Sequence, residues 1–143
     1  MTSNDWFYWA LLSAIFAALT AIFVKVGVQD VDADLATLIR TAIIIVVLSV
    51  FVISTGKWAN PFELLPKTWL FLGLSGLATG ASWVCYFRAL KIGDVSKVAP
   101  VDKFSLVLAA VFAFTFLEER PSSQEWFGIT MIAGGVLLLA LKR

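Results

Sequence analysis

Five long apolar runs fill almost the whole chain, and short polar segments separate them. The runs extend over about residues 6–28, 35–54, 68–90, 97–117 and 126–141. A helix needs about 20 mostly apolar residues to cross a hydrocarbon core roughly 30 Å thick, and the runs are close to this length, the last being the shortest. The pattern therefore predicts an all-α integral membrane protein, with five transmembrane helices that form a single domain over residues 1–143.

The polar segments between the runs carry residues that begin and end helices. Asp34 and Asp94 stand where N-caps would begin the second and fourth helices, and Gly27 and Gly93 stand where the first and third would end. Short loops force each helix to run antiparallel to the one before it. An odd number of spans then places the two termini on opposite sides of the membrane. We call the side on which the first helix begins side A and the opposite side B.

Aromatic and basic residues are placed as a membrane interface favours. Near the side-A ends lie Trp6, Tyr8, Trp9, Trp58, Trp69 and Trp126. The loop cations are balanced, with Lys57, Lys67 and Arg120 on side A and Lys91, Lys142 and Arg143 on side B. The helix-end cations Lys25, Arg88 and Lys97 add a modest bias toward a cytoplasmic side B. The chain is therefore compatible with insertion in both orientations, and we expect it in the plasma (inner) membrane of a prokaryote.

The composition agrees with a membrane protein and argues against several functions. Hydrophobic residues make up 60% of the chain and the mean hydropathy is +0.91, which is more apolar surface than a small soluble domain can bury, so lipid must cover the rest. The formal charge of +1 provides no basic surface for nucleic acid. The sequence has no histidine and one cysteine, Cys85, so it lacks the common general base, metal ligands and disulfide. We therefore expect no enzymatic activity, no cofactor and no bound metal.

Ionisable side chains inside the apolar runs are the most informative residues. Lys25 and Arg88 lie near helix ends, Arg40 lies inside the second run, and Asp102 and Lys103 lie inside the fourth. At about 1.5 Å per residue from the predicted caps, Arg40 lies roughly 9 Å deep and Asp102 about 12 Å deep. A charge at such depth costs about 2.5–3.5 kcal/mol on insertion scales, so these side chains should face protein or water. We expect a polar vestibule that opens on side B.

Each of these residues has a structural interpretation beside the functional one. Lys25 and Arg88 could snorkel to the interface, and Arg40 and Asp102 could form a structural salt bridge. Asp102 and Lys103 are adjacent and thus about 100° apart on a helix, which predicts that they do not point into one pocket as a pair. The five residues carry four positive charges and one negative charge, a sum of +3. This sum favours an anionic or carboxylate-bearing solute unless loop acids neutralise it.

Proline, aromatic residues and glycines mark further positions. Pro100 leaves the Ser96 carbonyl without its helical donor and predicts a kink beside Asp102, although proline is also tolerated in the first turns of a helix. Trp83 and Tyr86 share one helix face, where they could contact the solute or pack in the core. Close helix packing is the predicted role of two glycine sets, Gly73, Gly76 and Gly80 in the third run and Gly128, Gly134 and Gly135 in the fifth, the latter as a dimer contact.

Three segments resemble one repeat of the EamA family, within the drug/metabolite transporter superfamily. They are residues 35–44 (LATLIRTAII), 75–103 (SGLATGASWVCYFRALKIGDVSKVAPVDK) and 112–141 (FAFTFLEERPSSQEWFGITMIAGGVLLLAL), and the most specific part carries the elements RAL, APVDK and FLEER. Full-length members of this family are similar to two five-helix repeats, inserted with opposite orientations around a shared solute pathway. The resemblance implies that a chain with one repeat pairs as an antiparallel homodimer with ten helices in the membrane lipid.

The leading hypothesis is a membrane transporter or exporter of a small metabolite that works by alternating access in a homodimer. Arg40, Asp102 and Lys103 would line or gate the path. Four further candidates for substrate binding or gating are Trp83, Tyr86, Lys25 and Arg88. The alternative is a non-transporting or accessory membrane subunit that assembles with a different partner chain, in which case the glycines mediate assembly and the charges pair across the interface.

Overall fold

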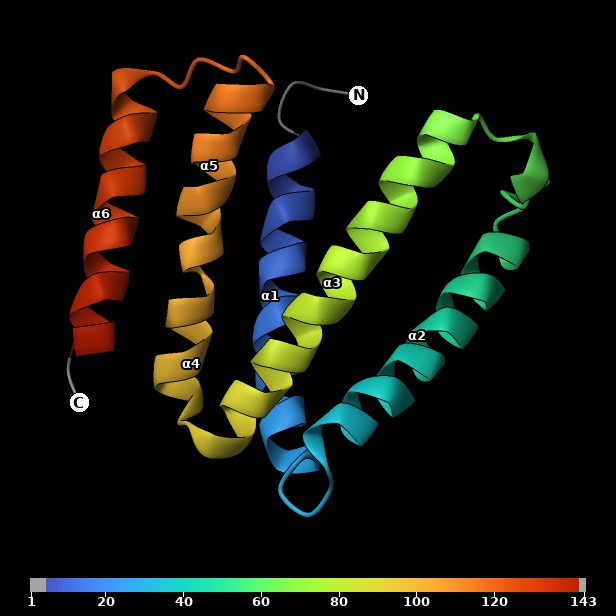
Figure 1. The fold of residues 1–143 in the computed structure, drawn as a ribbon, viewed down its shortest axis with the longest axis horizontal. Helices are drawn as coiled ribbons and strands as arrows, with labels where there is room; N and C mark the ends of the chain where they lie inside the picture. Colours follow the sequence, from blue (N-terminus) through green and yellow to red (C-terminus); the bar gives the residue numbers. More distant parts are fainter. Residues whose placement is uncertain (1–4, 142–143) are drawn as a thin grey trace. The chain divides into compact units, whose positions relative to one another are not determined.

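The computed structural model describes residues 5–141, and all regular secondary structure in this part of the chain is helical (Figure 1). Its elements are α1 (Asp5–Gly27), α2 (Ala33–Ser54), the 3-10 turn η1 (Pro61–Glu63), α3 (Pro66–Ile92), α4 (Val95–Asp102), α5 (Phe104–Phe116) and α6 (Ser123–Leu141). The loop cations Lys142 and Arg143 lie outside the described residues.

Five stretches of these helices are long and apolar enough to cross a membrane. They are Trp6–Gly27, Ala33–Ser54, Pro66–Ile92, Val95–Phe116 and Ser123–Leu141, so α4 and α5 together make the fourth span. These spans confirm the five apolar helices that the sequence predicts. The observed helices reach further than the apolar runs at several ends, because capping residues extend a helix beyond its apolar part.

The beginning of α2 corrects one predicted cap. Asp32, not Asp34, is the N-cap, because its Oδ1 accepts hydrogen bonds from the backbone N–H groups of Asp34 (3.0 Å) and Leu35 (3.1 Å). Helix α2 therefore begins at Ala33, and the Asp34 side chain is free to reach another helix. Asp94 does occupy the N-cap position of α4 as predicted, and its carboxylate lies 3.6 Å from Lys97 Nζ.

One compact unit comprises residues 22–92. It contains the end of α1 and the whole of α2 and α3. Helices α2 and α3 are antiparallel and meet where α2 begins and α3 ends, which is the side-B end. Val28, Phe87 and Leu90 are almost completely buried there. Ala33 and Thr37, in the first turns of α2, are also buried. Further along both helices the large apolar side chains are mostly exposed, as expected of surfaces that face lipid or another chain.

The other compact unit comprises residues 1–21 and 93–143, of which 5–21 and 93–141 are described. Within it α6 packs against α4 and α5, and Figure 1 shows α5 and α6 side by side. Phe114 of α5 and Trp126 of α6 meet edge to face, with ring centroids 5.9 Å apart. The start of α6 is a capping box, because Ser122 N–H and Oγ both donate to Glu125 Oε2, and Glu125 N–H donates back to Ser122 Oγ. This box explains why α6 begins before the predicted residue 126.

The fourth span is interrupted three residues after Pro100. Helix α4 ends at Asp102, Lys103 forms a turn, and α5 begins at Phe104. The backbone N–H of Lys103 donates to the Pro100 carbonyl, and the Lys103 carbonyl accepts from Leu106, both at 3.0 Å. Each bond spans three residues, as in a 3-10 turn, in place of the four residues that an α-helical bond spans.

Gly56 ends α2 in the left-handed conformation, with φ 67°. Its N–H donates to the Ile53 carbonyl at 3.1 Å, and the N–H of Lys57 donates to the Val52 carbonyl at 3.0 Å. This pair of bonds is the Schellman motif, which satisfies carbonyls that the helix end would otherwise leave without donors. The motif needs a residue that tolerates positive φ, and glycine does so without steric cost.

We expect Gly56→Ala to destabilise the protein by about 1–2 kcal/mol, because an alanine side chain disfavours the left-handed conformation. The cost is purely conformational, since a methyl group at this position meets no described atom within 4 Å. Thermal unfolding in detergent, followed by circular dichroism, measures the difference. Gly27→Ala is the matched control, because Gly27 also ends a helix in open space but lies outside the left-handed region. Equal losses from both substitutions would contradict this account.

Candidate functional site

The side-B end of the 22–92 unit is held together by an ion pair between α2 and α3. Arg88 Nε donates to Asp34 Oδ1 at 2.8 Å, and Arg88 Nη2 donates to Asp34 Oδ2 at 2.6 Å. Two parallel bonds of this kind match the planar fork of a guanidinium to a carboxylate. Both side chains remain accessible, so the pair lies at the surface of the unit and not in its core.

Two lysines bind the same end through main-chain carbonyls. Lys25 Nζ of α1 donates to the Leu90 carbonyl at 2.8 Å, and Lys91 Nζ of α3 donates to the Val31 carbonyl at 2.7 Å. The last carbonyls of a helix have no intrahelical donor, so the bond from Lys25 satisfies one of the groups that α3 leaves open. The end of α3 is thus connected to α1 through Lys25, to the α1–α2 loop through Lys91, and to α2 through the ion pair.

Arg40 differs from these cations because it rests on aromatic rings. Its guanidinium carbon lies 4.4 Å from the centre of the Trp83 ring and 5.4 Å from that of Phe87. Within the described unit 22–92, Arg40 forms no ion pair and donates no hydrogen bond to a protein acceptor. Arg40 and Trp83 are both half-buried, whereas Phe87 is buried. An aromatic face stabilises a cation without accepting its hydrogen bonds, so the N–H groups of Arg40 stay available to a ligand.

The neighbouring aromatic residue Tyr86 is half-buried and lies on α3 between the buried Phe87 and the exposed Cys85. The structure therefore brings Arg40 and Trp83 together from the predicted site, and places Tyr86 in the same turn of α3 as Phe87. Arg40 and Asp102, which the sequence analysis considered as a pair, belong to different compact units.

Asp102 and Lys103 correct a prediction. Lys103 Nζ donates to Asp102 Oδ2 at 3.3 Å, so the two side chains do form a pair, although adjacent residues on a helix were expected to diverge. The expectation was wrong because the long, flexible lysine side chain reaches the neighbouring carboxylate at the turn between α4 and α5. Asp102 is half-buried and Lys103 is more exposed, so the pair lies at an accessible break in the fourth span.

The glycines of the third and sixth helices lie on open faces. A methyl group added at any of them meets no atom within 4 Å among residues 5–141; they are Gly73, Gly76, Gly80, Gly128, Gly134 and Gly135. Close packing at these glycines therefore stays a prediction.

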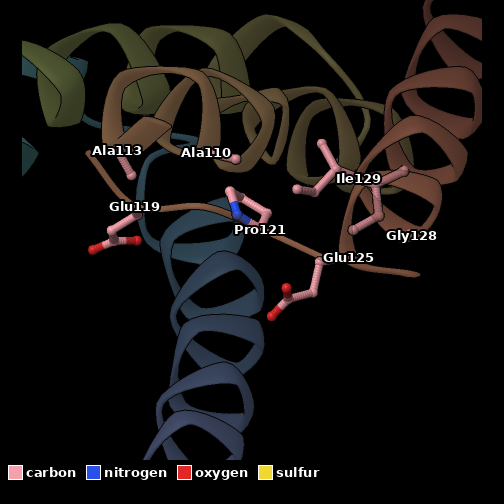
Figure 2. A pocket seen from close by; sticks show the side chains of 8 residues that line it. Ala110, Ala113, Glu119, Pro121, Glu125, Gly128 and Ile129 are labelled. Atoms are coloured by element: carbon pink, nitrogen blue, oxygen red, sulfur yellow. The ribbon is translucent and has the colours of Figure 1, made fainter. Parts of the chain in front are cut away.

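A shallow hollow of about 360 Å³ lies between α5 and α6 in the other unit (Figure 2). The small and apolar residues that line it are Ala110, Ala113, Pro121, Gly128, Ile129 and Ile132. Two acidic residues, Glu119 and Glu125, also line it. Figure 2 shows Glu119 and Glu125 on either side of Pro121. Glu125 is engaged by Ser122 in the capping box. The residues that line this hollow were not predicted as a site, although the spacing of Ser122 and Glu125 is the signature of a capping box.

The five apolar spans define a multi-pass integral membrane protein, and Arg40, inside the second span, contacts the rings of Trp83 and Phe87. The model of the EamA-like transporter family matches residues 5–141, and the chain belongs to this family, as the sequence predicts. The chain is 56% identical to the "Uncharacterized transporter in cobO 3'region" of Sinorhizobium sp, over 97% of this chain and 99% of that protein. This bacterial relative, the family and the five spans indicate a protein of the bacterial inner membrane.

Two further relatives differ in length from this chain. The "Uncharacterized transporter YxxF" of Bacillus subtilis is 26% identical over 94% of this chain, which covers 42% of that protein. The "Probable 4-amino-4-deoxy-L-arabinose-phosphoundecaprenol flippase subunit ArnE" of Pseudomonas fluorescens is 28% identical over 59% of this chain and 73% of its own length. No solved structure matches the chain.

We expect Arg88 and Asp34 to stabilise the side-B end through one shared interaction. Asp34→Ala and Arg88→Ala should each lower the unfolding temperature slightly, and the double variant should lower it no further than one of them, because both remove the same interaction. Arg88→Lys should not restore stability, since an ammonium group cannot form both parallel bonds. Asp30→Ala serves as the control, because Asp30 is a loop acid without an ion pair among the described residues. Additive losses would contradict the pairing.

Proposed function

We propose that this protein carries a small anionic solute across the membrane by alternating access, and that Arg40 binds the anionic group. The observation that carries the proposal is the contact of Arg40 with Trp83 and Phe87, which leaves the N–H groups of an intramembrane guanidinium without a protein acceptor in its unit. The neighbouring cations Lys25, Arg88 and Lys91 have protein acceptors. Among these four cations, Arg40 is therefore the one that is best prepared for a ligand.

The chemistry of the contact favours an oxyanion. A guanidinium presents its donors in one plane, and a carboxylate or phosphate can accept two of them in parallel. A charge at this depth costs roughly 2.5–3.5 kcal/mol on insertion scales, and a bound anion offsets part of that cost. Because the aromatic rings accept no hydrogen bonds from the guanidinium, they orient it without competing for the donors. The apolar rings also favour a solute with an apolar portion next to its anionic group.

An antiparallel homodimer accounts best for a chain with five spans. Two copies with opposite orientations place one Arg40 site toward each membrane face, which alternating access needs. The chain covers 42% of YxxF, so two copies approach the length of that relative, whereas the Sinorhizobium transporter has the length of one copy. The balanced loop cations support insertion both ways, and the open glycine faces of α3 and α6 are available for contact between copies. In this dimer the Asp102–Lys103 pair at the helix break would gate the path.

A second candidate is an accessory subunit that assembles with a different chain. The observation that favours it is the similarity to ArnE, whose name describes a flippase subunit. The phosphate group in the compound of that name is also an oxyanion that Arg40 could bind. In this case the glycine faces would contact the different partner chain.

Labelling of single cysteines tests the dimer directly. In a Cys85→Ala background, Asp30→Cys reports the α1–α2 loop and Lys57→Cys reports the α2–α3 connector. With an impermeant thiol reagent on intact cells, each position should be labelled in about half of the molecules, because both orientations are present. Labelling of one position alone would overturn the antiparallel dimer. The mass of the native complex then decides the alternative, since two different chains would indicate an accessory subunit.

A further inference from the structure

The connector between α2 and α3 exposes large apolar side chains although it is not part of a membrane span. Trp58 is 65% exposed, Phe62 88% and Leu65 71%. All three lie between Ser54, where α2 ends, and Pro66, where α3 begins. Loops in water usually carry polar residues, and an apolar cluster of this kind marks a surface that contacts something else.

The backbone of this connector already satisfies much of its hydrogen bonding. The N–H groups of Phe62, Glu63 and Leu64 donate to Asn60 Oδ1 (3.2 Å), the Asn60 carbonyl (3.2 Å) and the Pro61 carbonyl (3.3 Å). Two prolines, at 61 and 66, have no N–H to satisfy. A segment can enter a region poor in water only if its polar groups have such internal partners.

Side chains complete this arrangement. Trp69 Nε1, in the first turns of α3, donates to the Pro61 carbonyl at 3.0 Å, which ties η1 to α3. The Asn60 amide donates to Glu63 Oε1 at 3.1 Å, so the one carboxylate of the turn is partly satisfied within it. Phe62, which is 88% exposed, is therefore held on the outside of a turn whose hydrogen bonds are internal.

Two lysines border the apolar turn, Lys57 before it and Lys67 after it. Because both flanking helices are membrane spans, the connector lies where the hydrocarbon region gives way to headgroups. Lysines at this level extend toward lipid phosphates, and tryptophan favours the same zone. The connector between α5 and α6 is different, because it contains three consecutive charged residues, Glu118, Glu119 and Arg120.

We infer that the α2–α3 connector is inserted into the headgroup region of the bilayer, with Phe62 and Leu65 among the upper acyl chains and Lys57 and Lys67 at the phosphates. The partner of this surface is the lipid bilayer itself. The depth expected for such an interfacial segment is about 5–10 Å below the headgroup boundary. The inference is independent of the solute and of the oligomeric state.

Nitroxide accessibility tests the insertion. In a Cys85→Ala background, Phe62→Cys and Leu65→Cys are spin-labelled separately, and Glu119→Cys in the charged connector is the matched control. The intact protein is reconstituted in phosphatidylethanolamine–phosphatidylglycerol vesicles, with a nickel chelate present inside and outside so that orientation has no influence. Collisions with oxygen should exceed collisions with the chelate at positions 62 and 65, and the ratio should reverse at position 119.

Two outcomes would overturn the inference. Strong collisions with the chelate at positions 62 and 65 would place the connector in water. Protection of both positions from oxygen and from the chelate would show that protein, such as a second copy, covers the turn. Because Phe62 and Leu65 are largely exposed, their replacement leaves the packing of the unit intact, and helical content by circular dichroism verifies this.

Discussion

Replacement of Arg40 by alanine should weaken the binding of an oxyanion roughly 10- to 100-fold, because hydrogen bonds to a charged group contribute about 1.5–3 kcal/mol each. Inorganic phosphate and benzoate are suitable probes, one compact and one with an apolar ring. Their stabilisation of the purified protein against thermal unfolding measures the affinity. Arg40→Lys should recover little, since an ammonium group neither stacks on Trp83 nor presents a planar pair of donors.

The contact between Arg40 and the Trp83 ring provides a second test of the same site. Trp83→Phe should reduce anion binding less than Trp83→Leu, because a phenyl ring retains a weaker cation–π contact with Arg40 and leucine retains none. Arg120→Ala is the control for net charge, since it removes a cation from the α5–α6 connector in the other unit. The site assignment would be wrong if Arg40→Ala and Arg120→Ala weakened phosphate binding to the same degree.

Leu90→Ala should destabilise the protein by roughly 2 kcal/mol, at the lower limit for buried leucines in soluble proteins. Leu90 is 0% exposed near the end of α3, where α3 packs against α2, so its removal leaves a cavity in the buried part of the unit. The loss is smaller than in water because lipid also solvates the side chain when the helices separate, and packing alone is lost. Thermal unfolding in mild detergent measures the difference.

Leu77→Ala is the matched control for the buried leucine. Leu77 lies on the same helix but is 74% exposed, so lipid or detergent fills the space that the smaller side chain leaves. We expect almost no change in the unfolding temperature. A loss at Leu77 equal to that at Leu90 would show that the exposed face of α3 is packed in the solution state, and would point to a contact with another chain.

The spans could be predicted from the sequence because length and hydropathy determine them almost alone. The ends of helices were harder, since they depend on which of several polar residues makes the cap. Asp32 and Asp34 are both suitable acids, and only the structure shows that Asp32 accepts the two backbone bonds. The capping box of Ser122 and Glu125 was readable in the sequence, but it lies before the apolar run that defined the predicted start of α6.

The candidate site was accessible to sequence reasoning only in part. The cost of a buried charge identifies Arg40 whatever its surroundings, so its selection needed no structure. The partners could not be derived in this way. Arg88 and Asp34 are 54 positions apart, and nothing local distinguishes this carboxylate from the acids at 30 and 32. The pairing of Asp102 with Lys103 was missed because the prediction considered the helix directions of the two residues and not the reach of the lysine side chain.

The connections at the side-B end also constrain how the family can vary. Lys25 and Lys91 are bound to main-chain oxygens, which every amino acid supplies, so the side chains at positions 90 and 31 can be exchanged in evolution without breaking either bond. The bond between positions 34 and 88 depends on both side chains, so a change at one is tolerated only with a compensating change at the other. The three connections should therefore leave different records in related sequences, with covariation at the ion pair and none between each lysine and the residue whose carbonyl it binds.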